Sequence, residues 1–268
     1  MIRLIISDID GTLAPEGATG IHPEYMDVIR ALRECGVEFA AASGRQASSI
    51  DAIFHEIRDQ IYYLADNGAY IQRYGIPARE THMDLQDTKA LIADVRSIST
   101  CYSLLSTKDG FYTDNGTPEF HHLIFEEYRG KGGVVKDIND YVESCIKLSL
   151  YCHNGAREVY DRLYDRWKDK FILSISGAKW VDINDTSSTK GNAVQWIQET
   201  LGIGPEETVV FGDNFNDVSM LERSALSYAS VLAHPDVKKA ARYEVASYEE
   251  DGVLRVLKKL LGEIKNEA

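Results

Sequence analysis

The first eighty residues alternate between short apolar runs and amphipathic stretches, and this alternation constrains the fold more than any other feature of the chain. Runs of apolar residues predict buried strands, and apolar residues recurring every three or four positions predict helices. The predicted strands are 3–7, 37–42 and 61–65, separated by helices at about 23–36 and 46–57. This βαβαβ order with right-handed crossovers predicts a parallel sheet covered by helices on both faces.

The pattern changes at about residue 70, where hairpins and intervening helices replace the alternation. Turn sequences such as KDG and SGAK join strand-like segments, which is typical of an antiparallel sheet. Paired strands are predicted at 70–73 with 78–81, 103–106 with 111–113, and 171–176 with 179–183, and helices at 85–98, 118–128 and 156–167. The parallel pattern returns with a helix at 190–201, a strand at 208–211, a helix at 216–222 and a strand near 226–231.

These two patterns predict a core that is discontinuous in sequence. We expect an α/β fold in which a doubly wound parallel sheet, formed by residues 1–80 and 187–268, is interrupted by an inserted α+β unit at 81–186. With 268 residues, of which 44% are hydrophobic and 26% charged, the chain is long enough to bury such a core.

Charge and hydropathy exclude several classes of partner. The balance of 29 basic against 42 acidic residues gives a net charge of -13, which repels nucleic acids and requires local cations for any phosphate ligand. No segment approaches the roughly 20 apolar residues that cross a bilayer, and no signal pattern follows Met1. We therefore expect a cytoplasmic protein, monomeric or a small homo-oligomer, without membrane or nucleic acid partners.

The cysteines show no paired spacing of the CxxC type, and most of them lie in apolar runs. They are Cys35, Cys101, Cys145 and Cys152. Buried free thiols are expected, rather than disulfides or a zinc site.

Two aspartates follow the first predicted strand, in the segment SDIDGTL. A carboxylate at a strand end can attack phosphorus and form an aspartyl phosphate, so Asp8 is the predicted nucleophile. Asp10 lies on the same side of an extended chain, where it could protonate the leaving oxygen and then take a proton from water. For an isolated DxDG segment, helix capping would be the simpler interpretation. The other motifs of the chain favour catalysis.

A third aspartate, Asp213, follows the predicted strand at 209–211 in the segment GDNFND. If that strand and the one at 4–6 are neighbours, Asp8 and Asp213 face each other at the carboxyl ends of the sheet, where open parallel sheets bind ligands. Crowded carboxylates call for a hard divalent cation with oxygen ligands, most naturally Mg²⁺. Asn216 and Asp217, in the following turn, would support this site from behind the direct ligands.

Phosphate-binding groups are predicted at two further helix starts. In ASGR, the Ser43 hydroxyl and the free amides around Gly44 could hold a phosphate, with Arg45 as a local cation, although a simple serine cap is the alternative. Lys190, in STKG, could neutralise both a carboxylate nucleophile and the phosphate that it attacks. Asn67 follows the third strand and alone indicates only a turn.

The segments DIDGTL, ASGR, TKG and GDNFND, in this order, resemble the four motifs of the haloacid dehalogenase superfamily of phosphatases. The insertion between the second and third motifs, together with the ending AHPDVKKAARYEVASYEEDGV, resembles the Cof-like hydrolases of the sugar-phosphate phosphatase branch. The resemblance covers nearly the whole chain. It implies Asp8 as nucleophile, Asp10 as acid/base, Ser43 and Lys190 as phosphate binders, and Asp8, the Asp10 carbonyl and Asp213 as magnesium ligands, assisted by Asn216 and Asp217.

The chain departs from the Cof-like pattern before its HP pair, where Leu232 stands in place of the usual asparagine. This departure leaves the catalytic set intact. It means that the substrate of a better-known relative cannot simply be assigned to this chain. In the insertion, polar residues that could contact a substrate, or simply lie at the surface, are His121, His122, Arg129 and Lys131. The glycines at 130, 132 and 133 are predicted to be a connection, since no strand-loop-helix order surrounds them.

The expected activity is that of a Mg²⁺-dependent phosphatase acting on a small phosphorylated metabolite, a sugar or polyol phosphate, through an aspartyl phosphate. A phosphosugar mutase is an alternative, because the same aspartates could return the phosphoryl group to another hydroxyl. A phospho-accepting signalling module is a further alternative, opposed by Asp10, by GDNFND and by the large insertion.

Overall fold

The computed structural model describes residues 1–127 and 131–267. The chain divides into two compact units: Met1–Arg79 with Thr189–Ala268, and Glu80–Ser188. The second unit begins one residue before the predicted insertion at 81–186 and ends two residues after it. Each unit has its own sheet.

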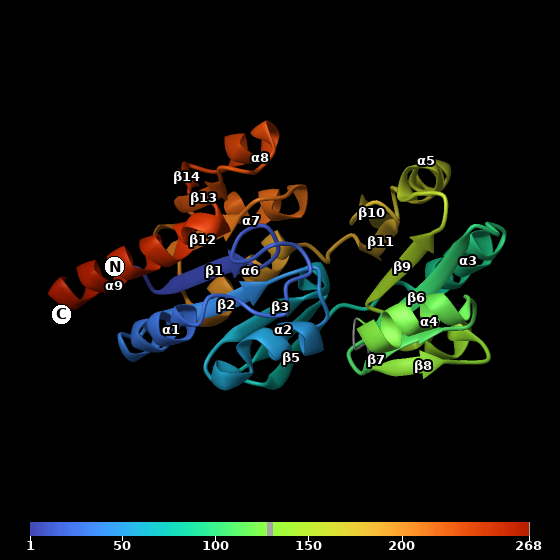
Figure 1. Cartoon of the computed structure of the whole chain (residues 1–268), viewed down its shortest axis with the longest axis horizontal. Helices are drawn as coiled ribbons and strands as arrows, with labels where there is room; N and C mark the ends of the chain where they lie inside the picture. Colours follow the sequence, from blue (N-terminus) through green and yellow to red (C-terminus); the bar gives the residue numbers. More distant parts are fainter. Residues whose placement is uncertain (128–130, 268) are drawn as a thin grey trace. The chain divides into compact units, whose positions relative to one another are not determined.

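The first unit contains an eight-stranded sheet in the order β14-β13-β12-β1-β2-β3-β4-β5 (Figure 1). Its strands are β1 Leu4–Asp8, β2 Glu38–Ala42, β3 Tyr62–Ala65, β4 Tyr70–Arg73, β5 Ile76–Glu80, β12 Thr208–Gly212, β13 Leu226–Ser230 and β14 Tyr243–Val245. The strands from β14 to β3 run parallel, and β4 is antiparallel to β3. The predicted doubly wound α/β core is thus confirmed.

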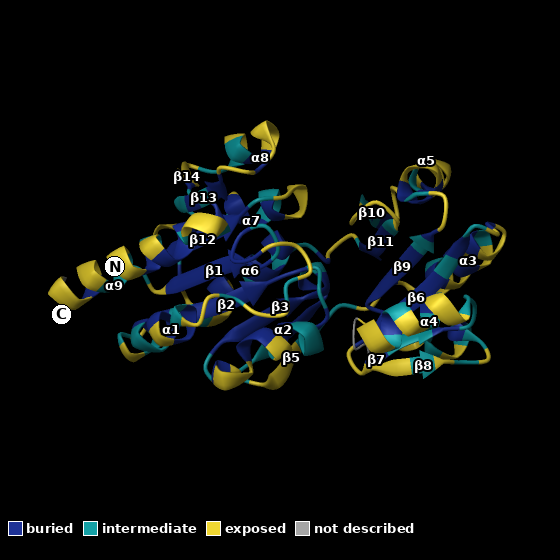
Figure 2. Cartoon of the chain, viewed as in Figure 1, coloured by how far each residue is buried: buried dark blue, intermediate teal, exposed yellow. Residues whose placement is uncertain are grey.

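Helices cover both faces of this sheet, which explains why its central strands are apolar throughout. They are α1 Glu24–Glu34, α2 Ala47–Phe54, α6 Lys190–Leu201, α7 Val218–Leu221, α8 Pro235–Ala240 and α9 Gly252–Glu267. Leu4 and Ile6 of β1 pack with residues of α6, α7 and α8. Ile5, which alternation points to the opposite face, is fully buried as well. Figure 2 shows buried strands beneath helices with exposed outer sides.

Three strands of this unit differ from the prediction. The hairpin of β4 and β5 was assigned to the start of the antiparallel pattern, but it extends the core sheet, because Tyr70 to Arg73 pair with β3. Strand β14 was not predicted. It has only three residues, and Tyr243 and Glu244 are exposed, so it lacks an apolar run that a sequence pattern could reveal.

The second unit contains a six-stranded sheet in the order β10-β11-β9-β6-β7-β8, antiparallel except for the β7–β8 pair. Its elements are α3 Leu85–Arg96, β6 Cys101–Thr107, β7 Gly110–Thr113, α4 Pro118–His122, β8 Gly132–Val134, β9 Lys147–Cys152, α5 Ala156–Trp167, β10 Phe171–Ile175 and β11 Trp180–Asp185. One face packs against α3 and α5 and forms the core of the unit. The predicted α+β insertion is confirmed.

Three predictions in this unit were incomplete. The helix expected at 118–128 ends at His122 and continues as a π-helical turn, Leu123–Glu127, while residue 128 lies outside the described residues. The glycines at 132 and 133, expected in a connection, form β8. The inner strand β9 was not predicted, because Lys147 and Ser149 interrupt its apolar run. Within residues 1–127 and 131–267, no helix is long and apolar enough to cross a membrane.

Candidate active site

The acidic motifs meet at the carboxyl ends of neighbouring strands of the first unit. Asp8 is the last residue of β1, and Asp213 directly follows β12, which pairs with β1. Ser43 directly follows β2, which pairs with the other edge of β1. The strand pairing that the sequence suggested for Asp8 and Asp213 is therefore confirmed. Open parallel sheets bind ligands at this edge.

Lys190 lies at the centre of the site, in the first turn of α6. Its Nζ donates hydrogen bonds of 2.6 Å to Asp8 Oδ1 and 2.6 Å to Asp217 Oδ1. The Lys190 side chain is only 1% exposed, and Asp217 is fully buried. Burial by itself lowers the pKa of Lys190, but the two carboxylates outweigh it and raise that pKa above its usual value. Lys190 therefore stays charged between its two acidic partners.

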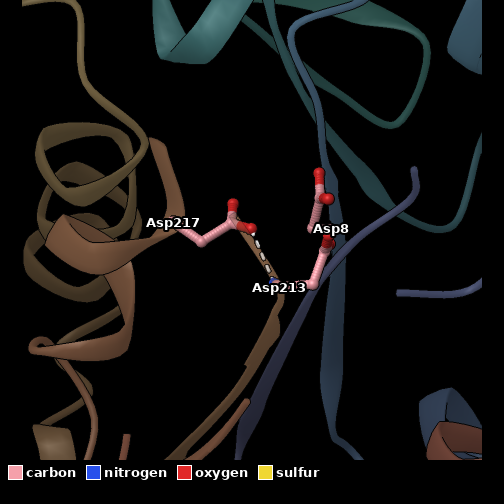
Figure 3. A group of neighbouring side chains, drawn as sticks. All are labelled: Asp8, Asp213 and Asp217. Atoms are coloured by element: carbon pink, nitrogen blue, oxygen red, sulfur yellow. Dashed lines mark hydrogen bonds between the residues drawn. The ribbon is translucent and has the colours of Figure 1, made fainter. Parts of the chain in front are cut away.

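Asp213 is held by the loops on either side of it. Its Oδ1 accepts a hydrogen bond of 2.6 Å from Thr12 Oγ1. Asp217 Oδ2 in turn accepts hydrogen bonds from the backbone N–H groups of Asp213, at 2.9 Å, and of Asn214, at 3.0 Å. Figure 3 shows the Asp8 and Asp213 carboxylates side by side, with Asp217 reaching the backbone of Asp213.

Gly11 makes this close approach possible. Its φ of +82° is a left-handed conformation that residues with a Cβ rarely adopt. A Cβ on Gly11 would lie 2.2 Å from Asp213 Oδ2, well inside contact distance. The turn after β1 can therefore pack against the Asp213 carboxylate only with a glycine at this position.

Three carboxylates could hold a metal ion. One oxygen from each of Asp8, Asp213 and Asp217 lies within 4.8 Å of the other two. Burial, followed by the nearby charge of Asp217, raises the pKa of Asp8 well above its usual value, despite the opposing effect of Lys190. Burial also raises the pKa of Asp213 to about 6. Such crowded, desolvated oxygen donors fit a hard divalent cation, which would relieve their mutual repulsion.

The side chain of Asp10 is engaged elsewhere, by Arg45. Arg45 donates to both carboxylate oxygens of Asp10, at 2.8 Å from Nε and 2.5 Å from Nη2, and its Nη1 donates to the Ala18 carbonyl at 2.6 Å. Ser43 Oγ lies 3.4 Å from Asp10 Oδ2. The structure thus pairs the predicted acid/base with the predicted phosphate-binding arginine. Asp217, rather than the Asp10 side chain, completes the carboxylate cluster.

The loops after β2, β3 and β12 are connected to one another. Arg45 N donates to Ser43 Oγ at 3.1 Å, and Asn67 N donates to the Ser43 carbonyl at 3.0 Å. Asn216 Nδ2 donates to Asn67 Oδ1 at 3.0 Å. Gly44 lies close to the same amide, because a Cβ on it would be 3.3 Å from Asn67 Oδ1. These contacts place four predicted site residues next to one another: Ser43, Gly44, Asn67 and Asn216.

Within the described part of the chain, the polar residues of the insertion that could contact a substrate make few contacts with one another. His121 makes a hydrogen bond of 3.2 Å with the Asn115 carbonyl, and His122 is 63% exposed, 3.8 Å from Glu127. Lys131 is exposed, and Arg129 lies outside the described residues. In the first unit, Leu232 is 62% exposed.

Two groups of functional interest were not predicted from the sequence. The first is Thr12 as a hydrogen-bond donor to Asp213, and the second is a buried ion pair in the second unit, Lys147 with Asp182, at 3.7 Å. A charged residue within the alternating segment KLSLYC was the available signal for the second group.

Comparisons with known proteins agree with the motifs. A sequence profile of haloacid dehalogenase-like hydrolases matches residues 5–257. The chain is 25% identical over 261 residues to the 5-amino-6-(5-phospho-D-ribitylamino)uracil phosphatase YbjI of Escherichia coli, a match that covers 97% of this chain and 96% of that protein.

Solved structures with similar folds also belong to this class of proteins. A crystal structure from Eubacterium rectale has a TM-score of 0.89 and 33% identity, covering 97% of this chain and 99% of that one. A sugar phosphatase of haloacid dehalogenase subclass IIB has the same fold, with a TM-score of 0.81 and 23% identity over 96% of this chain and 98% of that one. The chain therefore belongs to the haloacid dehalogenase-like hydrolase family, in its Cof-like branch, and is a phosphatase that acts on phosphate esters.

Proposed function

We propose that this phosphatase is Mg²⁺-dependent and hydrolyses a small sugar or polyol phosphate through an aspartyl phosphate on Asp8. The observation that carries the proposal is the carboxylate cluster of Asp8, Asp213 and Asp217 around the buried Lys190. A nucleophilic carboxylate, a cation site and a fixed ammonium group are what phosphoryl transfer to an aspartate requires.

In the first half of the reaction, an Asp8 carboxylate oxygen attacks phosphorus and the bond from phosphorus to the ester oxygen breaks. Lys190 already binds Asp8 Oδ1, so Oδ2 is the oxygen left to attack. Asp10 gives a proton to the departing oxygen, which leaves as an alcohol. This step requires Asp10 to exchange its contact with Arg45 for one with the substrate.

In the second half, Asp10 takes a proton from water while the water oxygen attacks phosphorus. The bond between phosphorus and Asp8 breaks, inorganic phosphate leaves and the Asp8 carboxylate is restored. Ser43, Asn216 and the backbone amides after β2 would bind the phosphate oxygens.

The residues that would hold magnesium are Asp8, Asp213 and the backbone carbonyl of Asp10, with Asp217 behind them. When bound, the cation supplies positive charge that offsets the carboxylates and the phosphate oxygens. Burial, with added repulsion from Asp217, raises the pKa values of Asp8 and Asp213, and a bound cation would offset the cost of keeping these carboxylates ionised.

The substrate class is supported by two relatives. The E. coli relative is named for a substrate with a phosphorylated ribityl chain, and the subclass IIB relative is named as a sugar phosphatase. We infer that the second unit, Glu80–Ser188, selects the alcohol part of the ester.

A screen of phosphorylated metabolites, with Mg²⁺ and with a chelator, tests the proposal. We expect phosphate release from polyol or sugar phosphates only with the cation, and a loss of about 10⁴-fold or more in Asp8→Asn, which should remain folded. Turnover by Asp8→Asn at near-normal rates would refute the role of Asp8. Isomerisation of the substrate with little free phosphate would show a mutase instead.

A further inference from the structure

Two cysteines of the second unit lie directly opposite each other on neighbouring strands. Cys101 is the first residue of β6, Cys152 is the last residue of β9, and the antiparallel register pairs one with the other. Both side chains belong to the core that the sheet forms with α3 and α5. Their Sγ atoms are 3.7 Å apart, although the residues are 51 positions apart in the chain. The sheet thus holds two free thiols in contact.

The backbone hydrogen bonds around this pair show that it is of the kind in which facing side chains come closest. Cys152 N donates to the Lys179 carbonyl at 2.7 Å, and so points away from Cys101. The two strands are joined beside the pair instead, where His153 N donates to the Thr100 carbonyl at 2.9 Å. In such non-hydrogen-bonded pairs the Cα atoms are about 4.5 Å apart, within the range of about 4.4–6.8 Å that a disulfide spans. A disulfide is therefore compatible with the positions of both strands.

The two thiols differ in acidity. A hydrogen bond from Cys152 lowers the pKa of Cys101, against the opposing effect of burial, and the charge of Arg162 lowers that pKa further. The same contact between the thiols, together with burial, raises the pKa of Cys152. The thiolate is the form of cysteine that peroxides oxidise. Cys101 is therefore expected to react first, with Cys152 beside it to complete the reaction.

The pair lies at an end of the sheet, where both strands stop. Cys101 follows a turn at 99–100 and is 4% exposed, and Cys152 is followed by the exposed His153 and Asn154. Strand ends open locally at a much lower free energy than the centre of a sheet. Hydrogen peroxide is little larger than a water molecule, so a small opening of this end is enough to bring it to Cys101.

We propose that Cys101 and Cys152 form a reversible oxidation site, which peroxides convert into a disulfide between β6 and β9. The Cys101 thiolate attacks one peroxide oxygen, the O–O bond breaks and hydroxide leaves, which gives a sulfenic acid. The Cys152 sulfur then attacks the Cys101 sulfur, the S–O bond breaks, and the oxygen leaves as water with the Cys152 proton. Hydroxide takes up the proton that Cys101 had released. The thiol pair thus loses two electrons, and the peroxide is reduced to two water molecules.

The position of Cys152 determines how far the oxidation goes. A sulfenic acid without a neighbouring thiol can be oxidised further to a sulfinic acid, which ordinary thiols do not reduce. Capture by Cys152 stops the reaction at a disulfide, which thiol reductants can open. The inference does not depend on the proposed function, because no step of it involves Asp8.

The chain contains two cysteines that serve as controls. Cys145 is fully buried in the same core, but its Sγ lies 3.6 Å from the sulfur of Met83, a thioether that cannot form a disulfide. Cys35, in the first unit, is half-buried and so more accessible than Cys101. Exposure alone would direct peroxide to Cys35, whereas proximity directs the cross-link to Cys101 and Cys152.

The test treats the reduced full chain with hydrogen peroxide, unfolds it in the presence of iodoacetamide and locates modified and linked peptides by mass spectrometry. We expect a peptide that links Cys101 to Cys152, lighter by two hydrogens than its reduced parts, and recovery of both thiols with dithiothreitol. Cys145 should remain available for alkylation, and Cys145→Ala should form the same link. In Cys152→Ala, Cys101 should instead give a sulfenic acid that dimedone traps, and more peroxide should convert it to a sulfinic acid.

Alkylation of Cys101 and Cys152 as complete as that of Cys145, at peroxide concentrations that oxidise free glutathione, would overturn the inference. A link to Cys35 or Cys145 in its place would do the same, as would a link that appears only when the chain is oxidised in urea. So would a sulfinic acid at Cys101 in the wild type. None of these readouts uses phosphatase activity, so a failure here is distinct from a failure of the role of Asp8.

Discussion

Lys190 Nζ donates a 2.6 Å hydrogen bond to Asp8 Oδ1, although the two residues are 182 positions apart in the chain. The same ammonium group binds Asp217, so one buried cation joins the first and last acidic motifs. The predicted nucleophile is therefore oriented before any substrate arrives. Preorganised charge of this kind costs no reorganisation during the reaction.

Lys190→Met should destabilise the protein strongly, because it leaves two buried carboxylates without their cation. We expect a loss of about 3–5 kcal/mol in the free energy of unfolding, measured by urea titration with a chelator present. Lys168→Met is the control, since Lys168 is 41% exposed, pairs with the exposed Asp165 and lies over the ring of Tyr164 at the surface. That variant should change stability by less than about 0.5 kcal/mol. Equal stabilities of the two variants would contradict the electrostatic role of Lys190.

Gly11→Ala should weaken Mg²⁺ binding, because the new methyl group would occupy the space of the Asp213 carboxylate. Gly17→Ala is the matched control: Gly17 has a similar φ of +75°, but a Cβ there would meet nothing within 4 Å. Both variants should lose about 1 kcal/mol of stability through the left-handed backbone. Only Gly11→Ala should need at least about tenfold more Mg²⁺ for half-maximal activity, and similar Mg²⁺ requirements in both would refute the steric argument.

Stability of the metal-free protein should fall as pH rises through about 6. Burial raises the pKa of Asp213 from 3.8 to about 6, so between these values the folded protein binds more protons than the unfolded chain. The stabilising contribution is complete below about pH 4 and is lost above the folded pKa. Asp213→Asn should reduce this dependence by on the order of 1–2 kcal/mol between pH 4.5 and 7.5 in chelator, leaving the part that comes from the raised pKa of Asp8.

The same titration predicts a change in the cation requirement. Protons compete with Mg²⁺ for Asp213, so the Mg²⁺ concentration for half-maximal activity should rise as the pH falls below about 6. Activity measured over a Mg²⁺ series at several pH values tests this. A requirement that is independent of pH from 5 to 7.5 would contradict the assignment of Asp213 as a ligand.

Asp10→Asn should slow turnover by about 10²–10⁴-fold, because asparagine can neither give a proton to the leaving oxygen nor take one from water. Acid quenching should then trap phosphate covalently bound to the protein when a substrate with a good leaving group is used. Arg45→Gln keeps Asp10 but removes its ion pair, and it should retain more activity than Asp10→Asn. The reverse order would show that the arginine, rather than the aspartate, matters for the chemistry.

The central part of the fold was predictable because its strands are short, apolar and bounded by polar motifs. The pairing of β1 with β12 follows from two buried runs that each end in an aspartate. Strand β9 was not predictable in the same way, since its Lys147 is buried by tertiary contacts that a local pattern does not contain. The Asp10–Arg45 contact likewise depends on how the turn after β1 folds back, with Gly17 N also donating to Asp10 at 3.0 Å.

The position of β1 in its sheet has a consequence for biosynthesis. One edge of this strand pairs with β2, which is made almost at once, but the other edge pairs with β12, which begins at Thr208. A ribosome must therefore translate the whole intervening segment before the amino-terminal strand is protected on both edges. Until then one edge of the apolar β1 stays unpaired, and an unpaired strand edge is a place where another chain can pair and aggregate.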